Sequence, residues 1–426
     1  MSFAVPFALG LSFSLLVAAA AWLRGRRLQR SFADAQESLR RKLSESKERA
    51  RNLTAELECV AEDSATSAAV TARQSAELYD AARMRRAYER RVRRAMDLEG
   101  ALWTQRTMAN TPKFVPLAKR GTPIVSVLNL KGGVGKTTIT AYLAQALAQS
   151  NLRVLMVDLD LQGSLSSLFI RTLELARMSE RNNGKFLHDL LSQPVDEPPR
   201  GIAEYAHEIP KLGPHARIIP TTDKLAYAEL SLTVQWLLRT GGENRTWNGR
   251  RDGRMILRRA LHRRGELKPF DVVLLDCPPL INLCCANALA ASDFILAPVT
   301  PSLKSIERVP ALLNRVREIQ SDVNPQLEML GLVINNTKQK SLTAQESDLF
   351  LTLPEQCRET YGEPVEQFDT TIPGVVAIRD NEEQFSALAE DSAIHDTFER
   401  LAEEFWKRLA AARPTPQPRR RRAGKS

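Results

Sequence analysis

From about residue 121 onward, hydrophobic positions fall into short continuous runs separated by longer helical stretches. Continuous apolar strands that alternate with helices are typical of a parallel sheet covered on both faces. The fold class predicted is therefore α/β, with a doubly wound and mostly parallel sheet. The predicted strands are Ile124–Leu128, Val154–Val157, Val272–Leu275, Phe294–Val299 and Leu330–Ile334.

The first hydrophobic segment differs from these runs, because residues 3–23 form 21 uncharged and mostly apolar positions. As a helix they would extend ~31 Å, which matches the hydrocarbon core of a bilayer. Trp22 ends the segment and arginines follow from Arg24, which by the positive-inside rule places the rest of the chain in the cytoplasm. We expect a transmembrane helix over 1–23 and a single-pass protein of the bacterial inner membrane. A cleaved signal peptide is the competing interpretation, although no Lys or Arg precedes the apolar stretch.

Residues 24–110 form a second region, which contains no proline and is rich in helix-forming residues. Apolar or small residues recur there at spacings that alternate between four and three, the pattern of a weak heptad seam. We expect a long basic helix that forms a coiled coil, and a solvated single helix is the alternative. The seam consists of Leu39, Leu43, Ser46, Ala50, Leu53, Leu57, Val60 and Ser64.

Charge is distributed unevenly along the 426 residues, whose formal net charge is +10. Residues 24–120 carry a net +9, the last 14 residues carry +6, and the remainder carries −5. Seven arginines fall between Arg83 and Arg94, a density that suits phosphate-bearing lipid or nucleic acid as well as a solvated face. Residues 411–426 are expected to be a disordered basic tail. The flanks therefore point to anionic partners, DNA or anionic lipid.

The five cysteines, an odd number without a CxxC pair, argue against a disulfide framework or a zinc ribbon. Cys277 is expected to be a small buried packing residue rather than a nucleophile.

A glycine loop follows the first predicted strand and precedes a helix, in the sequence NLKGGVGKTTITAYLAQALA. Glycines let backbone N–H groups turn inward around phosphates, and the start of the helix adds its dipole. Lys136 is expected to reach the β- and γ-phosphates, and the Thr137 hydroxyl to bind Mg²⁺. The sequence therefore predicts a nucleotide phosphate site.

Three carboxylates follow later strands of the predicted sheet. Asp158 and Asp160 end the strand in VLMVDLDLQGS, and Asp276 ends the strand in FDVVLLDCPPL. Carboxylates beside a phosphate loop suit Mg²⁺ ligation through water and the orientation of an attacking water. The alternative for the first two is that they cap the following turn.

These motifs resemble those of the ParA/MinD family of P-loop ATPases. KGGVGKTT is similar to the family's deviant Walker A motif, whose mark is an additional lysine at its start, here Lys131. DLDLQGS resembles the DxDxQG segment, with Leu161 where a proline is common. The stretch after Asp276, GLVINNT and FDTTIPGVVAIRD also resemble ParA segments, so that the likeness covers about 121–410, with a longer unmatched region near 171–215.

The resemblance implies a doubly wound sheet of the P-loop NTPase type and a homodimer that encloses two ATP molecules, with ATP and Mg²⁺ as cofactors. Lys131 would reach the partner's phosphates as an arginine finger does. Asp160 would position water, Lys136 would neutralise the γ-phosphate, and hydrolysis would be slow because it times dimer opening. Thr137, Asp158 and Asp276 would hold Mg²⁺. The expected nucleotide-binding residues are Gly132, Gly133, Val134, Gly135, Lys136, Thr137, Thr138 and, at the adenine, Asn335.

The function expected is a membrane-anchored ParA-like ATPase in the partitioning or positioning of DNA or a membrane complex, acting with an unidentified cargo or activator protein. A bacterial tyrosine autokinase of the same P-loop class is the alternative, and an iron–sulfur reductase is a third. Arginines crowd residues 239–268, where a DNA-facing patch is one interpretation and a solvated surface helix and loop is the alternative: Arg250, Arg251, Arg254, Arg258, Arg259, Arg263 and Arg264.

Overall fold

The computed structural model describes most of the chain from residue 111 onward and short pieces before it. Its contacts divide the chain into two units, Met1–Arg86 and Ala87–Ser426. In the first unit residues 44–51 are helical, whereas most of the predicted long helix, the segment 3–23 and the tail 413–426 lie outside the described residues. The described residues are 42, 44–51, 79–80, 83, 85–86, 103–104, 107, 111–180, 185–193, 200–239, 252–306, 308–335, 344–373 and 392–412.

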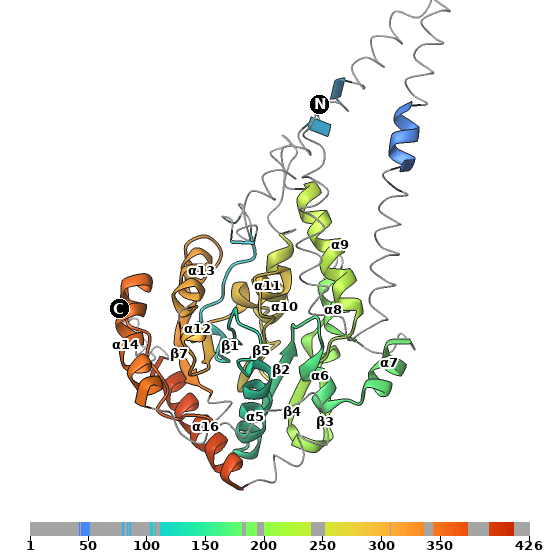
Figure 1. The fold of residues 1–426 in the computed structure, drawn as a ribbon. Coiled ribbons are helices and arrows are strands. Elements are labelled where there is room, and N and C mark those ends of the chain that lie inside the picture. Colours follow the sequence, from blue (N-terminus) through green and yellow to red (C-terminus); the bar gives the residue numbers. More distant parts are fainter. Residues whose placement is uncertain are drawn as a thin grey trace, which may run out of the picture. The chain divides into compact units, whose positions relative to one another are not determined.

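The second unit contains a seven-stranded sheet in the order β3-β4-β2-β5-β1-β6-β7 (Figure 1). All neighbouring strands pair in parallel except β3 and β4, which pair antiparallel at one edge. This confirms the predicted mostly parallel sheet. The strands are β1 Ile124–Val127, β2 Val154–Asp158, β3 His207–Ile209, β4 Gly213–Ile219, β5 Val272–Asp276, β6 Phe294–Val299 and β7 Glu328–Ile334.

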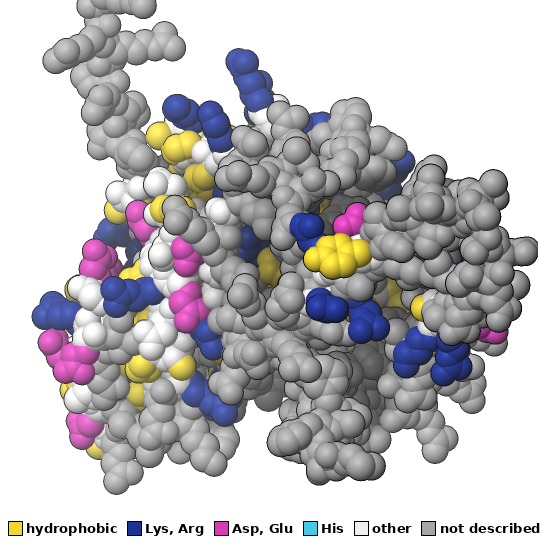
Figure 2. All heavy atoms as spheres, turned by 90° about the horizontal axis from the view of Figure 1, so that it is seen from above, with side chains coloured by type: hydrophobic (Ala, Val, Ile, Leu, Met, Phe, Trp, Pro, Cys, Tyr) yellow, Lys and Arg dark blue, Asp and Glu magenta, His cyan; other side chains and the backbone are white. Residues whose placement is uncertain are grey.

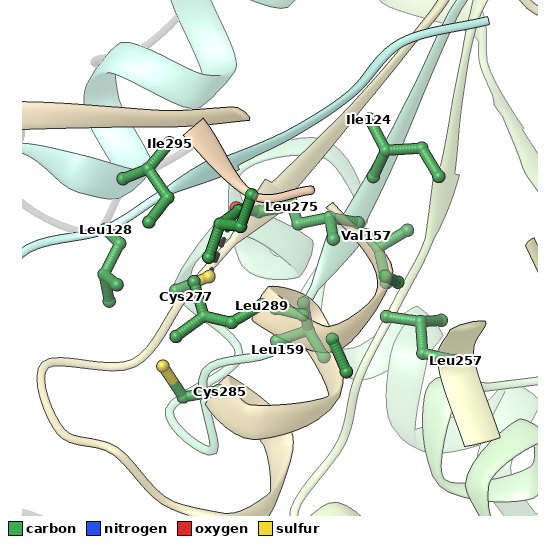
Figure 3. Close-up of a cluster of buried hydrophobic side chains, with 14 of the residues drawn as sticks. Ile124, Leu128, Val157, Leu159, Leu257, Leu275, Cys277, Cys285, Leu289 and Ile295 are labelled. Atoms are coloured by element: carbon green, nitrogen blue, oxygen red, sulfur yellow. Dashed lines mark hydrogen bonds between the residues drawn. The ribbon is translucent and has the colours of Figure 1, made fainter. Parts of the chain in front are cut away.

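Every residue of the central strands β1, β2 and β5 is buried, because side chains alternate between two covered faces. In β2, Leu155 and Val157 pack into one hydrophobic cluster, and Val154 and Met156 pack into the other. Figure 3 shows part of the first cluster, with Cys277 among aliphatic side chains. Cys277 is fully buried and its Sγ lies 3.6 Å from the carbonyl oxygen of Leu275, so it is a packing residue as expected.

One face of the sheet is covered by the helix that follows the glycine loop and by the last described helix, which contact each other (Figure 1). The helices with residues in this cluster are α4 Leu117–Arg120, α5 Lys136–Gln149, α6 Ser164–Phe169, α7 Thr172–Glu180 and α16 Ser392–Ala412.

The opposite face is covered by helices from the middle of the chain. They are α8 Leu187–Leu191, α9 Lys224–Arg239, α10 Ile256–Leu261, α11 Leu283–Ala291, α12 Leu303–Ile306, α13 Val309–Asp322 and α14 Ala344–Tyr361. Short 3₁₀ turns lie between these elements: η1 Ile202–Glu204 between α8 and β3, η2 Pro210–Leu212 between β3 and β4, and η4 Gly253–Met255 between α9 and α10.

Residues that precede the first strand also pack on this unit. Val115 N donates a hydrogen bond to His262 Nδ1 (3.0 Å), and the Phe114 ring lies edge-on to the His262 ring. Thr107 N donates to the carbonyl of Asp322 (3.0 Å). The unit that contains the glycine loop therefore includes described residues before position 121.

Within the part of the chain that the structure describes, no helix is long and apolar enough to cross a membrane. The predicted localisation, a single pass through the bacterial inner membrane with the ATPase domain in the cytoplasm, is therefore contradicted. An apolar run of suitable length identifies a candidate span only. The segment 3–23, on which that prediction depended, lies outside the described residues.

Candidate nucleotide site

The glycine loop joins β1 to α5, as predicted. Two of its positions adopt backbone conformations that favour glycine. Gly133 and Gly135 have φ of 72° and 89°, a region that disfavours residues with a Cβ. A Cβ on Gly135 would lie 2.1 Å from Asn335 Nδ2, so this position also excludes a side chain sterically. Gly132 and Gly133 are exposed, whereas Val134 is buried beneath the loop and Thr138 lies in the first turn of α5.

Asn129 fixes the start of the loop. Its Oδ1 accepts a hydrogen bond from Lys131 N (2.9 Å) and its Nδ2 donates to the carbonyl of Pro298 (2.7 Å). The fully buried amide thus ties the loop to the end of β6, and the sequence reasoning had not singled it out.

The two lysines of the loop have different environments. Lys136 is buried, its Nζ donates to the carbonyl of Lys131 (3.2 Å), and burial lowers its pKa although Asp276 and Asp160 oppose this shift. Lys131 is half-buried, and its Nζ donates to Thr300 Oγ1 (3.3 Å) and Ser302 Oγ (3.2 Å) of the same chain. The Lys136 ammonium is therefore held inside the loop, whereas that of Lys131 lies against the segment after β6.

The expected magnesium residues meet at the carboxyl edge of the sheet. Asp158 and Asp276 are paired Cα partners of the parallel strands β2 and β5, and both are fully buried. Thr137 Oγ1 donates a hydrogen bond to Asp276 Oδ2 (2.8 Å). Burial and the neighbouring Asp158 raise the pKa of Asp276 well above its usual range.

Asp158 is held by the first turn of α6. Ser166 donates to Asp158 Oδ2 from both its backbone N (2.8 Å) and its Oγ (2.6 Å), and Asp160 N donates to Asp158 Oδ1 (3.2 Å). Burial raises the pKa of Asp158 to about 7, although the Ser166 hydrogen bonds oppose this. The contact of Ser166 with Asp158 was not predicted from the sequence, because the only clue to it is the position of Ser166 in the first turn of the helix after the DxDxQG segment.

Asp160 is more open than its two neighbours. Its Oδ1 accepts a hydrogen bond from Gln162 N (3.1 Å), and burial raises its pKa while Lys136 acts against this. Glu229 of α9 lies within electrostatic range of Asp160 and was also missed from the sequence. Its Oε1 accepts a hydrogen bond from Leu283 N (2.8 Å), and burial raises its pKa to about 7.

The residues present fit Mg²⁺ bound with a nucleotide. Asp276 Oδ1 is buried and has no hydrogen-bond partner, although it lies beside the Thr137 hydroxyl. Among the described residues no group of three or more His, Cys, Asp and Glu side chains forms a metal site. Two carboxylates and a hydroxyl suit an ion that keeps several waters and takes phosphate oxygens as further ligands.

Asn335 lies beside the loop, at the end of β7. Its Nδ2 donates to the carbonyl of Val134 (2.8 Å), and its buried Oδ1 has no hydrogen-bond partner among the residues that the structure describes. The side chain is only 1% exposed. The structure therefore shows Asn335 packed on the glycine loop, and its predicted contact with adenine stays a prediction.

Of the arginines of residues 239–268 that the structure describes, Arg254 and Arg258 are buried and Arg264 is exposed, so the DNA-facing patch stays a prediction without its two buried members. Arg254 and Arg258 are only 1% and 4% exposed and bind the unit's own groups: Arg254 pairs with Asp252, and Arg258 donates to the carbonyls of Ala290 and Val323. Arg263 pairs with Glu266. Of the expected patch residues, Arg250 and Arg251 lie outside the described residues.

A glycine loop between a parallel strand and a helix, with carboxylates on the neighbouring strands, defines a P-loop nucleotide-binding protein. A family model described as an AAA domain matches residues 122–329. The chromosome-partitioning ATPase Soj of Thermus thermophilus is 31% identical over 291 residues, which cover 68% of this chain and 97% of Soj. The chromosome partitioning protein ParA of Caulobacter vibrioides is 29% identical over 255 residues, covering 60% of this chain and 82% of ParA.

The fold also matches solved structures. Cobyrinic acid a,c-diamide synthase of Mycobacterium smegmatis, solved with a bound ATP analogue and magnesium, superposes with a TM-score of 0.51. It is 24% identical, and the match covers 70% of this chain and 99% of the synthase. At this identity the likeness concerns the fold.

The chain belongs to the ParA/Soj family of P-loop ATPases. The prediction of an ATPase is thereby confirmed, and the predicted cofactors, ATP and Mg²⁺, agree with the ATP analogue and magnesium bound by a protein of the same fold. Family membership favours a ParA-like ATPase over the tyrosine autokinase and the iron–sulfur reductase.

Proposed function

We propose that this protein is a partitioning ATPase that binds ATP and Mg²⁺ as a sandwich homodimer and uses slow hydrolysis to switch its binding of DNA or of a partner protein. The observation that carries the proposal is the meeting of Lys136, Thr137, Asp158 and Asp276 at one edge of the sheet, around a glycine loop. The names of the relatives in Thermus and Caulobacter point to chromosome partitioning as the process.

Each residue of the site has a role that its position supports. The N–H groups of residues 132–138 would bind phosphate oxygens, with the dipole of α5 behind them. Thr137, Asp158 and Asp276 would hold Mg²⁺, which when bound neutralises charge on the phosphates. Asp160 would orient water, because it is the carboxylate of this edge that is not fully buried. The ammonium of Lys136 would stabilise charge that develops on the terminal phosphate.

The sandwich dimer is supported by apolar side chains exposed near the same edge. Tyr227 and Leu230 of α9 are 40% and 36% exposed, and Leu280, in the segment after Asp276, is 51% exposed. The hydrogen bond from Leu283 N to Glu229 brings α9 and this segment together. Exposed apolar groups gathered beside a site are typical of a surface that binds another protein.

Lys131 would reach the partner's phosphates only after it leaves Thr300 and Ser302. These are two hydrogen bonds of a half-buried ammonium, each worth about 0.5–3 kcal/mol, which a phosphate can replace with charge-assisted ones. The geometry of the single chain thus supports a lysine that changes partners on dimerisation.

DNA is the second partner proposed. The support lies in the charge of the flanks, a net +9 over residues 24–120 and +6 over the last 14 residues, whereas the described Lys and Arg side chains are dispersed among acidic and neutral ones on the face shown in Figure 2. Non-specific binding to DNA is largely electrostatic, so the affinity should fall steeply with added salt. Binding that is insensitive to salt would contradict this part of the proposal.

The test measures ATP hydrolysis and molecular mass in solution for the full chain, with and without ATP and Mg²⁺. The wild type is expected to dimerise with ATP and to hydrolyse it slowly. The Lys136→Ala and Asp160→Ala variants should lose at least about 100-fold in the rate of hydrolysis. The Lys131→Ala variant should stay monomeric, or should dimerise without hydrolysing ATP. Lys268→Ala, which changes an exposed lysine outside the site, is the matched control and should behave as the wild type. A chain that stays monomeric when saturated with ATP would disprove the sandwich dimer, and wild-type hydrolysis by Asp160→Ala would disprove its role.

A further inference from the structure

A pair of tryptophans joins the N-terminal part of the chain to the helices beside the nucleotide site. The rings of Trp103 and Trp236 lie 5.3 Å apart between centroids, and each residue is only 6% exposed. Leu283 and Ala286 of α11 complete the cluster, against which Leu232 and Ile281 pack. A residue that precedes the first strand by some twenty positions is thus buried between α9 and α11.

The backbone carbonyl of Trp103 is hydrogen-bonded as well as its ring being packed. The carbonyl of Trp103 accepts a hydrogen bond from Arg254 Nη1 (3.2 Å), and Arg254 is in turn held by both carboxylate oxygens of the buried Asp252 (3.0 and 2.7 Å). The guanidinium also lies 5.8 Å from the centre of the Trp236 ring. The buried ion pair of Arg254 and Asp252 therefore binds the backbone at Trp103.

Leu283 connects this cluster to the nucleotide edge. Its side chain is fully buried in the cluster, and its N–H donates to Glu229 Oε1. Glu229 and Trp236 are seven residues apart on α9, which places them on one face of that helix. Helix α9 therefore contacts the start of α11 through both a hydrogen bond and an aromatic ring.

The link from Leu283 back to Asp276 is short and stiff. Only six residues separate them, in the sequence CPPLIN, and its two prolines have fixed φ angles. Asn282, the last of the six, caps α11 by accepting a hydrogen bond from Cys285 N (2.9 Å). The start of α11 is thus joined through a short, proline-containing segment to the end of β5, where Asp276 lies beside Thr137.

We propose that the docking of Trp103 between α9 and α11 is coupled to the nucleotide site through Leu283, with Glu229 as a positioning residue. This inference rests on the proposed function, because the site to which the docking is coupled is the one that would bind ATP and Mg²⁺. The coupling is reciprocal by thermodynamic linkage: a docked Trp103 favours one nucleotide state, and that state favours docking by the same factor. The part of the chain before Trp103 thereby gains an influence on nucleotide turnover.

The experiment compares full-chain variants by the kcat and KM of ATP hydrolysis. Trp103→Ala is expected to change kcat or KM by about fivefold or more, the lower end of typical coupling factors. Trp406→Ala, which removes an indole that packs on the opposite face of the sheet, is the matched control and should change neither. Glu229→Ala should act as Trp103→Ala does, and Glu229→Gln should rescue the wild-type values, because an amide oxygen still accepts from Leu283 N.

A second measurement covers the case in which Trp103→Ala does not fold. The near-UV circular dichroism difference between the wild type and Trp103→Phe isolates the signal of the tryptophan pair, and it should change when ATP and Mg²⁺ are added. An unchanged difference signal at saturation, or a folded Trp103→Ala with wild-type kcat and KM, would overturn the inference. A wild type that hydrolyses no ATP would instead contradict the proposed function.

Discussion

Asp158 and Asp276 lie side by side as paired residues of two parallel strands, and neither carboxyl group has any contact with solvent. Burial raises the pKa of both; the neighbouring Asp158 adds to the shift of Asp276, and Asp160 adds to the shift of Asp158. Two buried acids side by side destabilise the folded chain when no ligand is bound, and they favour the binding of a cation beside them. The edge of the sheet is therefore built for a ligand rather than for stability.

Asp276→Asn should have opposite effects on stability and on ligand binding. Without ligand, removal of one of the two buried acids should raise the free energy of unfolding by about 1–2 kcal/mol, because Asn can still accept the Thr137 hydrogen bond. Stabilisation by ATP and Mg²⁺ should disappear. Thermal unfolding with and without the ligands measures both, and Asp396→Asn, at an exposed position, is the control. Equal stabilisation of Asp276→Asn and wild type by ATP and Mg²⁺ would contradict its assignment to the site.

Ser166→Ala should destabilise the protein by about 1–3 kcal/mol. The Ser166 hydroxyl donates to Asp158 and accepts from Thr221 N (2.9 Å), so its loss leaves two buried groups with one partner fewer. Ser167→Ala is a matched control, since that hydroxyl bonds only the carbonyl of Gly163 one turn earlier. Chemical denaturation measures the difference, and equal effects of the two changes would refute the role given to Ser166.

The contribution of His262 to stability should fall when the pH is lowered from 7 to 5, whereas the buried acids Asp158 and Glu229, whose pKa values are raised, act in the opposite direction. Its Nδ1 accepts from Val115 N and its Nε2 lies 2.8 Å from the carbonyl of Ala291, so the ring is held neutral, and burial lowers its pKa to about 3. The unfolded chain takes up a proton below about pH 6.5 and the folded chain does not, so stability is present above this pH and is lost below it. The loss at pH 5 is about 2 kcal/mol.

His262→Gln is the comparison for that prediction, since an amide can accept and donate in the same places without titrating. The difference in unfolding free energy between the two chains should shrink or reverse as the pH falls. A constant difference between pH 7 and pH 5 would show that His262 is not responsible.

Arg254→Met should lower the free energy of unfolding by about 3–5 kcal/mol, because it leaves the buried Asp252 without its partner. Asp252→Asn in the same chain should restore part of the loss. Arg315→Met, which removes a half-exposed pair with Glu318, should cost about 1 kcal/mol or less. If Arg254 were a surface DNA contact, its replacement would change DNA affinity and leave stability unaltered.

The strands of the central sheet were predictable from the sequence to within two residues. Their two faces are both covered, so each appears as a continuous apolar run, as in Val272–Asp276. The edge strand His207–Ile209 and its neighbour Gly213–Ile219 were missed, because they lie in or next to the region unmatched by the resemblance and contain exposed or half-buried positions among the buried ones. A mixed pattern of this kind does not separate an edge strand from a loop.

For two arginines the sequence predicted exposure where the structure shows burial. Arg254 and Arg258 stand in an arginine-rich stretch, and composition alone suggested a charged surface. Their burial depends on Asp252 and on backbone carbonyls of α11 and of Val323, which come from other parts of the chain. A run of charged residues in the sequence does not indicate which of them will be buried with a carboxylate or a backbone carbonyl as partner.

The sequence by itself determined the parallel sheet, the glycine loop and the three carboxylates of its edge, because the positions of the strands and the chemistry of the loop are carried by local runs of residues. Only the tertiary structure decided that Asp158 and Asp276 form a registered pair, that Ser166 and Glu229 belong to their surroundings, and that Trp103 is buried beside Leu283. Each of these depends on which distant segments come together, and that is fixed by packing across the whole unit rather than by any local pattern.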